Sequence, residues 1–556
     1  MAMQPGASAV ERVPVEVWLE IFKQVPKSTD LHSLSVASRK CCSITTRALH
    51  RDLVWDKERQ VAQDLDVWQT DAGMASRVRS LVLSIGGVPA NNTSAQNAFI
   101  LGNYVWPSAL KGLTPAAQQA LLAPNKQVLF RPEQVQAVLW ARVETFTNLS
   151  SLVLKDMTIR NGHFRLIHNL AQLRSLSLIG CNVDHGAADG FNNQALPITS
   201  LTMIGVRRGR GATVHAHAWH NPAFFAPVQP NPLPQLQLAL AQANLPIAQI
   251  LLNQGNPPPV APDSFAQALS LAAAPTLRTL KVDSSTDVFR HVFDAPGAED
   301  RGWVAPPMLE HLHVLQVRTI TAKVRDHVED YHSPSLYNFC SRAHRLKTIS
   351  APVFAPSDVT MDPDELPHGL VSFAAPLDTA QFVAAHRDVK ALGVLKCGLD
   401  TPKAIEALAL IALARPGLEV LVFEVKTWDA EIVAAISRHF KQLRRLKLVY
   451  GRGGPDENYV VNLGAELELP ELHTLEMYKL PPKGGYTPEH PTHLFDNTWG
   501  SIEEEMRDLL IPWNHWCPKL RRVQLVSGYA MTRGFKGALW KMETVKRLKR
   551  MEYLDY

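Results

Sequence analysis

The feature that most constrains this chain is a recurring spacing of leucines, in which a leucine is followed by others three and five residues later. This strict pattern starts at Leu149, Leu173, Leu233 and Leu443. With 69 leucines in 556 residues, a random order would give roughly one such match. Because each segment is too short to bury its own apolar face, it can gain a core only by stacking on neighbouring copies.

A looser form, with other apolar residues in place of leucine, starts at thirteen positions: Val78, Leu149, Leu173, Ile198, Leu277, Leu309, Leu346, Leu370, Val389, Leu418, Leu443, Leu472 and Leu520. The loose form alone is weak, because it arises by chance roughly fifty times in a chain this apolar. The spacing adds weight: steps of 24 and 25 residues join the copies from Leu149 to Ile198, and steps of 29, 25 and 29 join those from Val389 to Leu472.

The best copy, Leu173 to Asn182, is similar to the leucine-rich-repeat signature, including its Cys/Asn step at Cys181. Amphipathic stretches at 404–412 and 432–440 predict helices between the strands. We therefore expect an α/β fold in which an irregular, curved, leucine-rich-repeat-like solenoid has parallel strands and outer helices. Longer gaps, and a proline-rich segment at about 206–265 that contains Leu233, predict interrupted repeats and an insertion.

Residues 13–55 predict three short helices in close order. Pro14 suits the first position of a helix, apolar residues from Val17 to Val25 follow at helical spacing, and Ser38 can cap the third helix. A unit this small leaves much of its apolar surface exposed, and such a surface usually marks a protein interface.

The same segment resembles the F-box motif of the F-box proteins abundant in fungi. The resemblance covers about 45 residues. It is carried by Val13-Pro14-Val15-Glu16-Val17, Ile21-Phe22, Pro26, the run from Asp30 to Arg39, and a closing Trp55. Two positions depart from the motif: Val13 stands where leucine is common, and Cys41 stands where the third helix usually has an aromatic residue.

The resemblance implies a Skp-type adaptor as partner and, through it, a cullin–RING ubiquitin ligase. The repeat region would recruit a protein substrate, and the chain itself would not be an enzyme. By position, the implied adaptor-binding residues are Val13, Pro14, Glu16, Ile21, Phe22, Leu31, Leu34 and Val36. The alternative is a non-ligase interaction scaffold whose N-terminal helices only cap the solenoid.

These readings divide the chain into an F-box at 8–57, a linker with the first irregular repeats at 58–145, and the solenoid at 146–556. On a repeat strand the leucines point inward, and the residues between them face the concave surface where ligands bind. The substrate-binding candidates are Arg445, Lys447, Glu476, Tyr478, Arg522 and Gln524. Ordinary exposed strand residues are the alternative for each of them.

Composition excludes several classes of function. A net charge of +5 is too small for a nucleic-acid-binding protein of this size. The six cysteines form no CxxC pair, which argues against a disulfide framework or a cysteine-based zinc site. No apolar stretch is long enough to span a membrane, and no basic-then-apolar leader opens the chain, so we expect a cytoplasmic or nuclear protein.

No motif nominates a catalytic centre, a metal site or a cofactor site. The histidines from His215 to His220 lack a fourth ligand and a neighbouring cysteine or carboxylate. The glycine-rich turn Gly451 to Gly454 follows a predicted strand, as phosphate-binding loops do, but no Lys-Ser/Thr completes it and no helix is predicted directly after it. A phosphate-binding enzyme is the rival that this turn suggests, and a connection between repeats is the favoured interpretation.

Overall fold

The computed structural model of the chain describes residues 13–23, 25, 28–56, 75–84, 99–100, 129–130, 139–184, 193–208, 268–283, 292–293, 305–315, 333–352, 354, 361–397, 399–479, 494–545 and 554. The chain forms two units, one made of Met1–Ile198 with Thr202–Ala274 and the other of Thr199–Leu201 with Pro275–Tyr556. The predicted proline-rich insertion, the histidines from 215 to 220 and the Leu233 copy lie outside the described residues, except that 206–208 are described.

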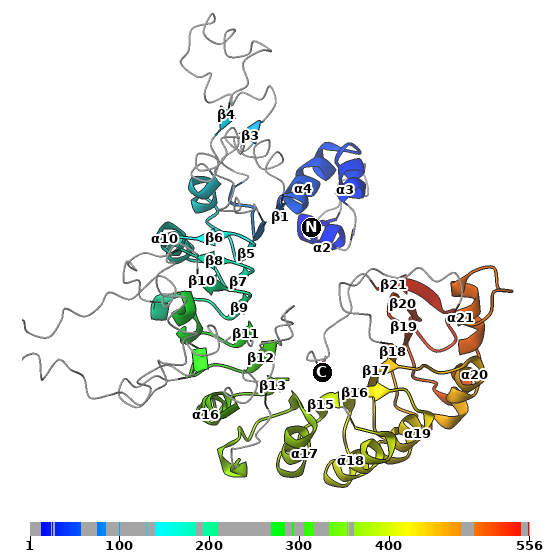
Figure 1. Ribbon diagram of the computed structural model, residues 1–556. Coiled ribbons are helices and arrows are strands. Elements are labelled where there is room, and N and C mark those ends of the chain that lie inside the picture. Colours follow the sequence, from blue (N-terminus) through cyan, green and yellow to red (C-terminus); the bar gives the residue numbers. More distant parts are fainter. Residues whose placement is uncertain are drawn as a thin grey trace, which may run out of the picture. The chain divides into compact units, whose positions relative to one another are not determined.

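The first elements described in the first unit are three helices, called the head below: α2 (Val15–Lys23), α3 (Ser28–Ser35) and α4 (Arg39–Leu49) (Figure 1). The three predicted helices are thus confirmed as helices. The Pro14 carbonyl accepts the Trp18 N–H at 3.2 Å, which is the first hydrogen bond of α2. Ser38 caps α4 as predicted, because its Oγ accepts the Cys41 N–H at 3.0 Å.

The head has an apolar core of its own. Phe22, Leu31 and Ile44, one from each helix, are 2%, 8% and 1% exposed and pack together. Cys41, also buried, adds to the interior of α4. Partly buried apolar residues of the same three helices and the turn after α2 surround this cluster: Val15, Trp18, Leu19, Val25, Leu34, Ala48 and Leu49.

Directly after the head, the chain enters a parallel sheet in the order β1-β2-β5-β7-β9. The strands are β1 (Asp52–Trp55), β2 (Ser80–Leu83), β5 (Ser151–Lys155), β7 (Ser175–Ile179) and β9 (Ser200–Ile204). Trp55, which closes the F-box-like segment in the sequence, is fully buried in β1, with its ring 6.0 Å from that of Phe146. The last part of the predicted 8–57 domain therefore belongs to the sheet.

Regular repeats are clearest between Leu149 and Arg208. A second, smaller parallel sheet runs beside the first and consists of β6 (Thr158–Ile159), β8 (Asn182–Val183) and β10 (Arg207–Arg208). Asp156, Gly180 and Gly205 follow consecutive strands of the main sheet at steps of 24 and 25 residues, and all three have positive φ angles. Cys181 fills the predicted Cys/Asn step, where its buried Sγ–H donates to the Leu154 carbonyl at 3.2 Å.

Other described elements of this unit include α10 (Asn161–Asn169), the antiparallel pair β3 (Phe99–Ile100) and β4 (Leu129–Phe130), and the short 3-10 turns η2 (Asn193–Ala195) and η4 (Leu271–Ala273). Among the described residues, no helix of either unit is long and apolar enough to cross a bilayer.

Among the described residues of the second unit, nine parallel strands follow one another in chain order from β11 to β19, and two antiparallel strands come after them at the end of the sheet. The strands are β11 (Thr279–Asp283), β12 (His311–Leu315), β13 (Thr348–Ser350), β14 (Ser372–Ala375), β15 (Ala391–Cys397), β16 (Val420–Thr427), β17 (Arg445–Arg452), β18 (Thr474–Lys479), β19 (Arg522–Val526), β20 (Tyr529–Thr532) and β21 (Lys541–Thr544).

Helices connect these strands and lie along one side of them (Figure 1). They are α16 (Ser333–Arg342), α17 (Leu377–His386), α18 (Thr401–Ala414), α19 (Ala430–His439), α20 (Glu457–Glu466), α21 (Ile502–Leu510) and α22 (Trp513–Trp516), with a 3-10 turn η6 (Pro363–Glu365). The helices predicted at 404–412 and 432–440 are confirmed as α18 and α19.

All thirteen predicted repeat starts are followed by a strand at the same distance. The strands β2, β5, β7, β9 and β11 to β19 each begin two residues after a predicted start, and each of these starting residues is at most 2% exposed. The residue after a starting residue accepts hydrogen bonds from the neighbouring repeat. After Leu418, for example, the Glu419 carbonyl accepts the N–H groups of Arg444 at 2.8 Å and Arg445 at 3.1 Å. The predicted stack of parallel strands is therefore confirmed.

Candidate interaction surfaces

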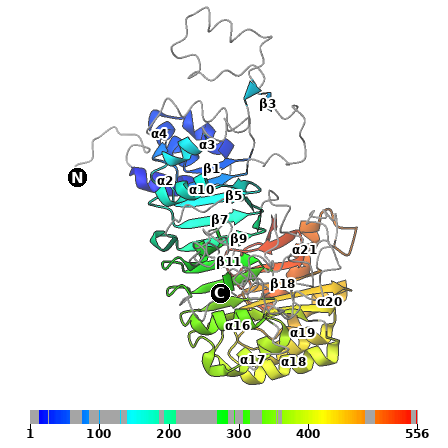
Figure 2. The ribbon, with the colours of Figure 1, turned by 60° about the vertical axis from the view of Figure 1, so that its left-hand side comes forward.

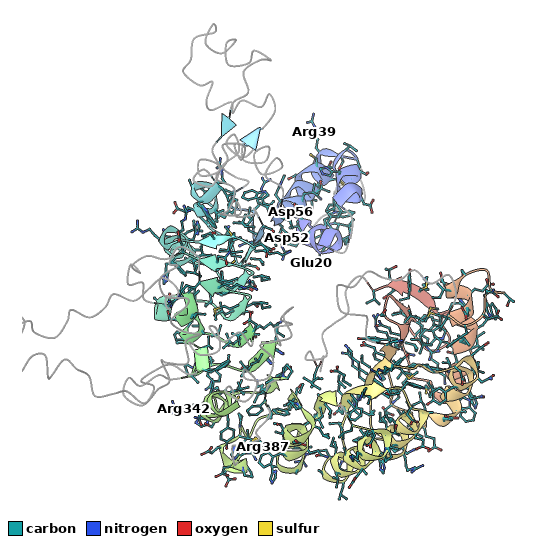
Figure 3. All side chains as sticks on the ribbon, in the orientation of Figure 1. Glu20, Arg39, Asp52, Asp56, Arg342 and Arg387 are labelled. Carbon is teal, nitrogen blue, oxygen red and sulfur yellow. The ribbon has the colours of Figure 1, made fainter. Side chains whose placement is uncertain are left out.

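The head exposes a row of residues on α2. Pro14, Val17 and Ile21 are spaced by three and four residues, so they share one helix face. Pro14 is exposed, and Val17 and Ile21 are 46% and 45% exposed although both are large and apolar. We call these three residues the α2 row. Glu20 on α2 and Arg39 at the start of α4 lie at opposite ends of the head (Figure 3).

The predicted adaptor-binding residues divide into a surface set and a core set. Pro14, Glu16, Ile21 and Val36 are exposed, with Val36 at 85%, and Val13 and Leu34 are half-buried. Phe22 and Leu31, also predicted as adaptor contacts, are only 2% and 8% exposed and pack in the head core.

Phe22 and Leu31 are buried because three helices of this size need a core of their own, and their most inward apolar residues form it. Val17 was not among the predicted contacts. Its spacing of three residues from Pro14 and four from Ile21 would have predicted that it shares their helix face.

The substrate-binding candidates form a charge cluster on β17 and β18. Arg445 and Lys447 are two positions apart on β17, so their side chains share one face of the strand. In the parallel register, Lys447 lies opposite Glu476 of β18. Arg445 Nη2 is 3.0 Å from Glu476 Oε1, and Lys447 Nζ is 3.6 Å from Glu476 Oε2. The Lys447 ammonium also lies 5.8 Å from the centre of the Tyr478 ring. One carboxylate thus holds two cations in the interior.

Most of these candidates are buried, which corrects the prediction that they line an open surface. Lys447 is 1% exposed, Glu476 7%, and Tyr478 and Gln524 2% each. Gln524 donates through Nε2 to the carbonyls of Val526 at 3.1 Å and Ser527 at 3.2 Å, which fixes the turn after β19. The alternation of a strand tells which side chains share a face, and packing from elsewhere in the chain decides whether that face is open.

Arg522 differs from the buried candidates because a third of its side chain is exposed. Its Nη1 lies 3.4 Å from Glu543 Oε2 on β21, and the same carboxylate accepts the Thr532 hydroxyl at 2.9 Å. Arg522 thus contributes to a surface contact between the closing strands of the second unit.

The same sheet face is apolar on the neighbouring strands. Parallel register places Val420 of β16 opposite Arg445 and Val422 opposite Lys447. Further along, Gly393 of β15 lies opposite Val422, and Ala374 of β14 lies opposite Gly393. This face therefore changes from small and apolar residues on β14–β16 to buried charges on β17 and β18.

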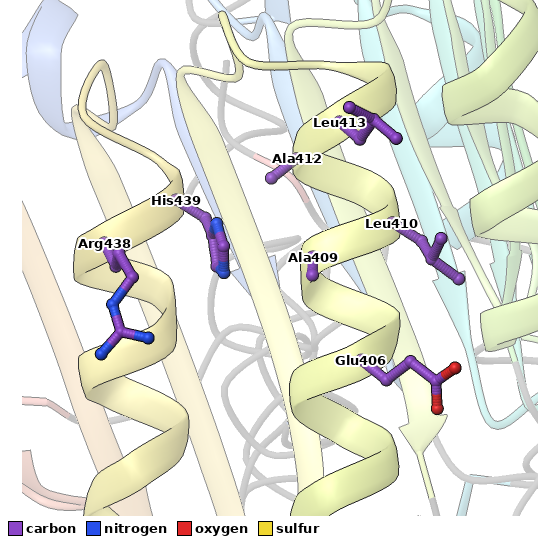
Figure 4. Close-up of a pocket in the computed structure, with 7 residues that line it drawn as sticks. All are labelled: Glu406, Ala409, Leu410, Ala412, Leu413, Arg438 and His439. Atoms are coloured by element: carbon purple, nitrogen blue, oxygen red, sulfur yellow. The ribbon is translucent and has the colours of Figure 1, made fainter.

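The helix side of the second unit carries a shallow pocket of about 450 Å³ between α18 and α19 (Figure 4). Leu410 and Leu413 of α18, 53% and 83% exposed, stand on one wall, and Arg438 and His439 of α19 stand on the other. Glu406 supplies the carboxylate of this pocket. Within the described ranges, no group of three or more His, Cys, Asp or Glu side chains is placed to hold a metal ion.

The glycine-rich turn is a connection between repeats, as favoured from the sequence. Gly453 has a φ of 74°, and a Cβ on it would lie 3.3 Å from the Cβ of Trp428. Helix α20 starts soon after the turn, at Glu457, which the sequence did not predict. Its first turn is capped by the Asp456 carboxylate, which accepts the Tyr459 N–H at 2.7 Å. The Asp456 carboxylate thus occupies one of the N–H groups that a phosphate at this helix start would need.

No protein-family model and no curated protein sequence matches the chain. Among solved structures, it is similar to an internalin, InlF, from Listeria monocytogenes, with 10% identity, a TM-score of 0.21, and coverage of 55% of this chain and 76% of that one. It is also similar to the protein of a TLR13–ssRNA13 complex, with 11% identity, a TM-score of 0.24, and coverage of 82% of this chain and 44% of that one. Scores this low support no inference about function. From its own strands and helices, the fold is leucine-rich-repeat-like.

Proposed function

We propose that the chain is the substrate-recruiting subunit of a cullin–RING ubiquitin ligase, in which the head binds a Skp-type adaptor and the repeat region binds a protein target. The chain itself carries no catalytic step in this proposal. It raises the concentration of the target near a ubiquitin-loaded enzyme, which is a rate effect of proximity. A cytoplasmic or nuclear location belongs to the same proposal.

The observation that carries the proposal is the exposed α2 row beside a complete head core. Val17 and Ile21 are nearly half exposed, while Phe22, Leu31 and Ile44 already satisfy the interior of the three helices. Exposed apolar residues on one helix face favour binding, because a partner that covers them removes their apolar surface from water. The resemblance of 13–39 to the F-box motif names the kind of partner.

Co-purification with a purified Skp-type adaptor tests the proposal. The full chain is expected to retain the adaptor, and a Val17→Asp, Ile21→Asp double variant is expected to lose it, because two buried carboxylates at the interface would be desolvated without partners. The matched control is Leu410→Asp, Leu413→Asp on α18, where two apolar residues that are more exposed than Val17 and Ile21 are changed far along the chain. Equal retention of the adaptor by wild type and by the α2 variant would refute the docking face.

A non-ligase scaffold is the second candidate, and the direct passage from the head into the sheet favours it. Only a short link separates the end of α4 at Leu49 from the start of β1 at Asp52, which supports a head that caps the first strand. This alternative predicts that neither the wild type nor the α2 variant binds the adaptor, and that Phe22→Ala exposes β1 and β2 to faster amide hydrogen exchange.

A further inference from the structure

Helix α18 is apolar on its outer side as well as on the side that packs against its own unit. Ten of its fourteen residues are alanine, isoleucine or leucine. Its buried residues are Ala404, Ala407, Leu408, Ile411 and Ala412. Leu410 and Leu413 are outside this set, at 53% and 83% exposure, so they add little to the core of the unit. Because a helix that is apolar all round is normally covered all round, the outer side of α18 has the composition of an interface.

The exposed residues of α18 and of its neighbour α19 form one face. Glu406, Leu410 and Leu413 are spaced by four and three residues, and Figure 4 shows them on one side of α18. Helices α17, α18 and α19 follow one another along the helix side of the second unit (Figure 2). On α19, Glu431 and Arg438 are exposed and are seven residues apart, so they also share a side. We call these five residues the α18–α19 face.

The two helices are aligned, which fixes the levels of these side chains. Both helices connect parallel strands, so they run in the same direction. They end at equivalent points, 25 residues apart in the sequence. Residues 25 positions apart therefore lie at the same level. Glu406 and Glu431 share the level nearer the helix starts, and Leu413 and Arg438 share the level nearer the helix ends.

Charges of opposite sign are separated along these helices. Residues 399–479 are all described, so the count is complete for α18, α19 and their caps. The caps at the helix starts and the first halves carry Asp400, Lys403, Glu406, Asp429 and Glu431, and the ends carry Arg415, Arg438, His439 and Lys441. Lys403 is 3.9 Å from Asp400, and Lys441 is 2.7 Å from Glu468. Within the described part of the chain, Glu406, Glu431 and Arg438 form no ion pair, so the face is acidic near its start and basic near its end.

We propose that the α18–α19 face binds the same face of a second copy of this chain, with the helices of the two copies antiparallel about a two-fold axis. A two-fold pair requires a face that is complementary to itself. In the antiparallel arrangement, Glu431 of each copy lies opposite Arg438 of the other, whereas a parallel arrangement would place like charges together. The level midway between Glu431 and Arg438 is that of Leu410. The axis therefore passes near Leu410, and the exposed leucines of the two copies cover one another.

Sedimentation equilibrium of the full chain tests the proposal. The wild type is expected to rise from the monomer mass of 61.6 kDa toward twice that mass between about 1 and about 100 μM, a range typical of a small interface. For Leu410→Asp, Leu413→Asp, the dissociation constant is expected to rise at least about tenfold, because carboxylates would be desolvated near the axis. The matched control is Phe535→Asp, Leu539→Asp, which changes two residues of 68% and 78% exposure between β20 and β21 and is expected to associate as the wild type does.

An exchange of charges tests the antiparallel orientation. Glu431→Arg and Arg438→Glu are each expected to weaken self-association at least about tenfold, because each places like charges opposite one another twice in the dimer. An equimolar mixture of the two variants restores both pairs of opposite charge, so mixed dimers are expected to form with an affinity close to that of the wild type. Each variant changes exposed side chains, and circular dichroism checks that it is folded.

Three results would each overturn the proposal. They are a wild type that stays monomeric throughout the range, a leucine variant that associates as the wild type does, and a mixture of the charge variants that associates no better than either variant alone. The proposal does not depend on the ligase function. The Leu410→Asp, Leu413→Asp variant has an unchanged head, so it is expected to bind the adaptor as a monomer, and the adaptor test and this test can fail separately.

Discussion

Lys447 Nζ lies 3.6 Å from Glu476 Oε2, and both residues are buried, at 1% and 7% exposure. Arg445 Nη2 lies 3.0 Å from the other oxygen of the same carboxylate, so both cations contact Glu476. Such a cluster stabilises the fold only while it is complete, since a buried charge without its partner is costly.

Replacing Glu476 therefore has a large expected effect on stability. Glu476→Gln removes the shared negative charge and is expected to lower the free energy of unfolding by about 3–5 kcal/mol. The matched control is Glu468→Gln, which breaks an exposed ion pair with Lys441 of 2.7 Å and is expected to change stability little. Urea unfolding followed by fluorescence measures both, and equal effects would show that burial does not govern the cluster.

Two helix glycines are expected to respond to alanine with opposite signs. Alanine is the better helix former by roughly 0.5–1 kcal/mol. A Cβ on Gly464 of α20 would lie 2.8 Å from Trp513 Cδ1 and 3.1 Å from its Cα, so Gly464→Ala is expected to destabilise. A Cβ on Gly162 of α10 meets no atom within 4 Å, so Gly162→Ala is expected to stabilise. Thermal unfolding midpoints of the two variants check the sign.

Buried histidine makes the first unit sensitive to acid. Burial, with a smaller contribution from Arg160, lowers the pKa of His163 from 6.5 to about 4, and its Nδ1 accepts the Arg160 N–H at 2.9 Å. Below pH 6.5 His163 takes up a proton in the unfolded chain, whereas in the folded chain it does so only near pH 4. The contribution of neutral His163 to the free energy of unfolding is therefore complete above pH 6.5, and up to about 3 kcal/mol of stability is lost as the pH falls toward 4.

The variant His163→Asn keeps an acceptor for the Arg160 N–H but does not titrate. It is expected to lose less stability than the wild type between pH 7 and pH 5, measured by urea unfolding. His368→Asn changes an exposed histidine and serves as the control, with an expected slope like that of the wild type. A His163→Asn slope identical to the wild type would contradict the assignment.

Cysteine reactivity is expected to follow burial. Cys42 is exposed, whereas Cys181 and Cys340 are buried. Burial raises the pKa of the Cys181 thiol to about 11 and that of Cys340 to about 12, which lowers the reactive thiolate fraction at pH 8 by roughly a hundredfold or more. Timed alkylation with iodoacetamide and mass spectrometry should modify Cys42 first, and this order should disappear in urea.

Local patterns predicted the elements of this fold well. The leucine spacing located every one of the thirteen strand starts, because the starting residue of each repeat must be inside for neighbouring repeats to stack. Helical spacing and the Ser38 cap likewise located the head. These features depend on contacts over a few residues, which the order of the residues carries directly.

The candidate sites were predicted less well, because a site depends on which surfaces remain open. Periodicity identified Phe22 and Ile21 as apolar neighbours on α2, but only packing of the three helices put Phe22 inside and left Ile21 exposed. In the same way, the sequence predicted Trp55 at the end of the helical motif, but it is part of β1.

Residue order alone was thus enough to place the repeat strands, the connecting helices and the alternation of side chains along each strand, since all of these follow from local periodicity. Folding in three dimensions decided the rest. It buried Lys447 against Glu476 and brought Leu554 onto Gly393, contacts that join residues on different strands or at great distances along the chain. Such contacts follow from the burial of apolar surface across the whole unit, which no short stretch of sequence encodes.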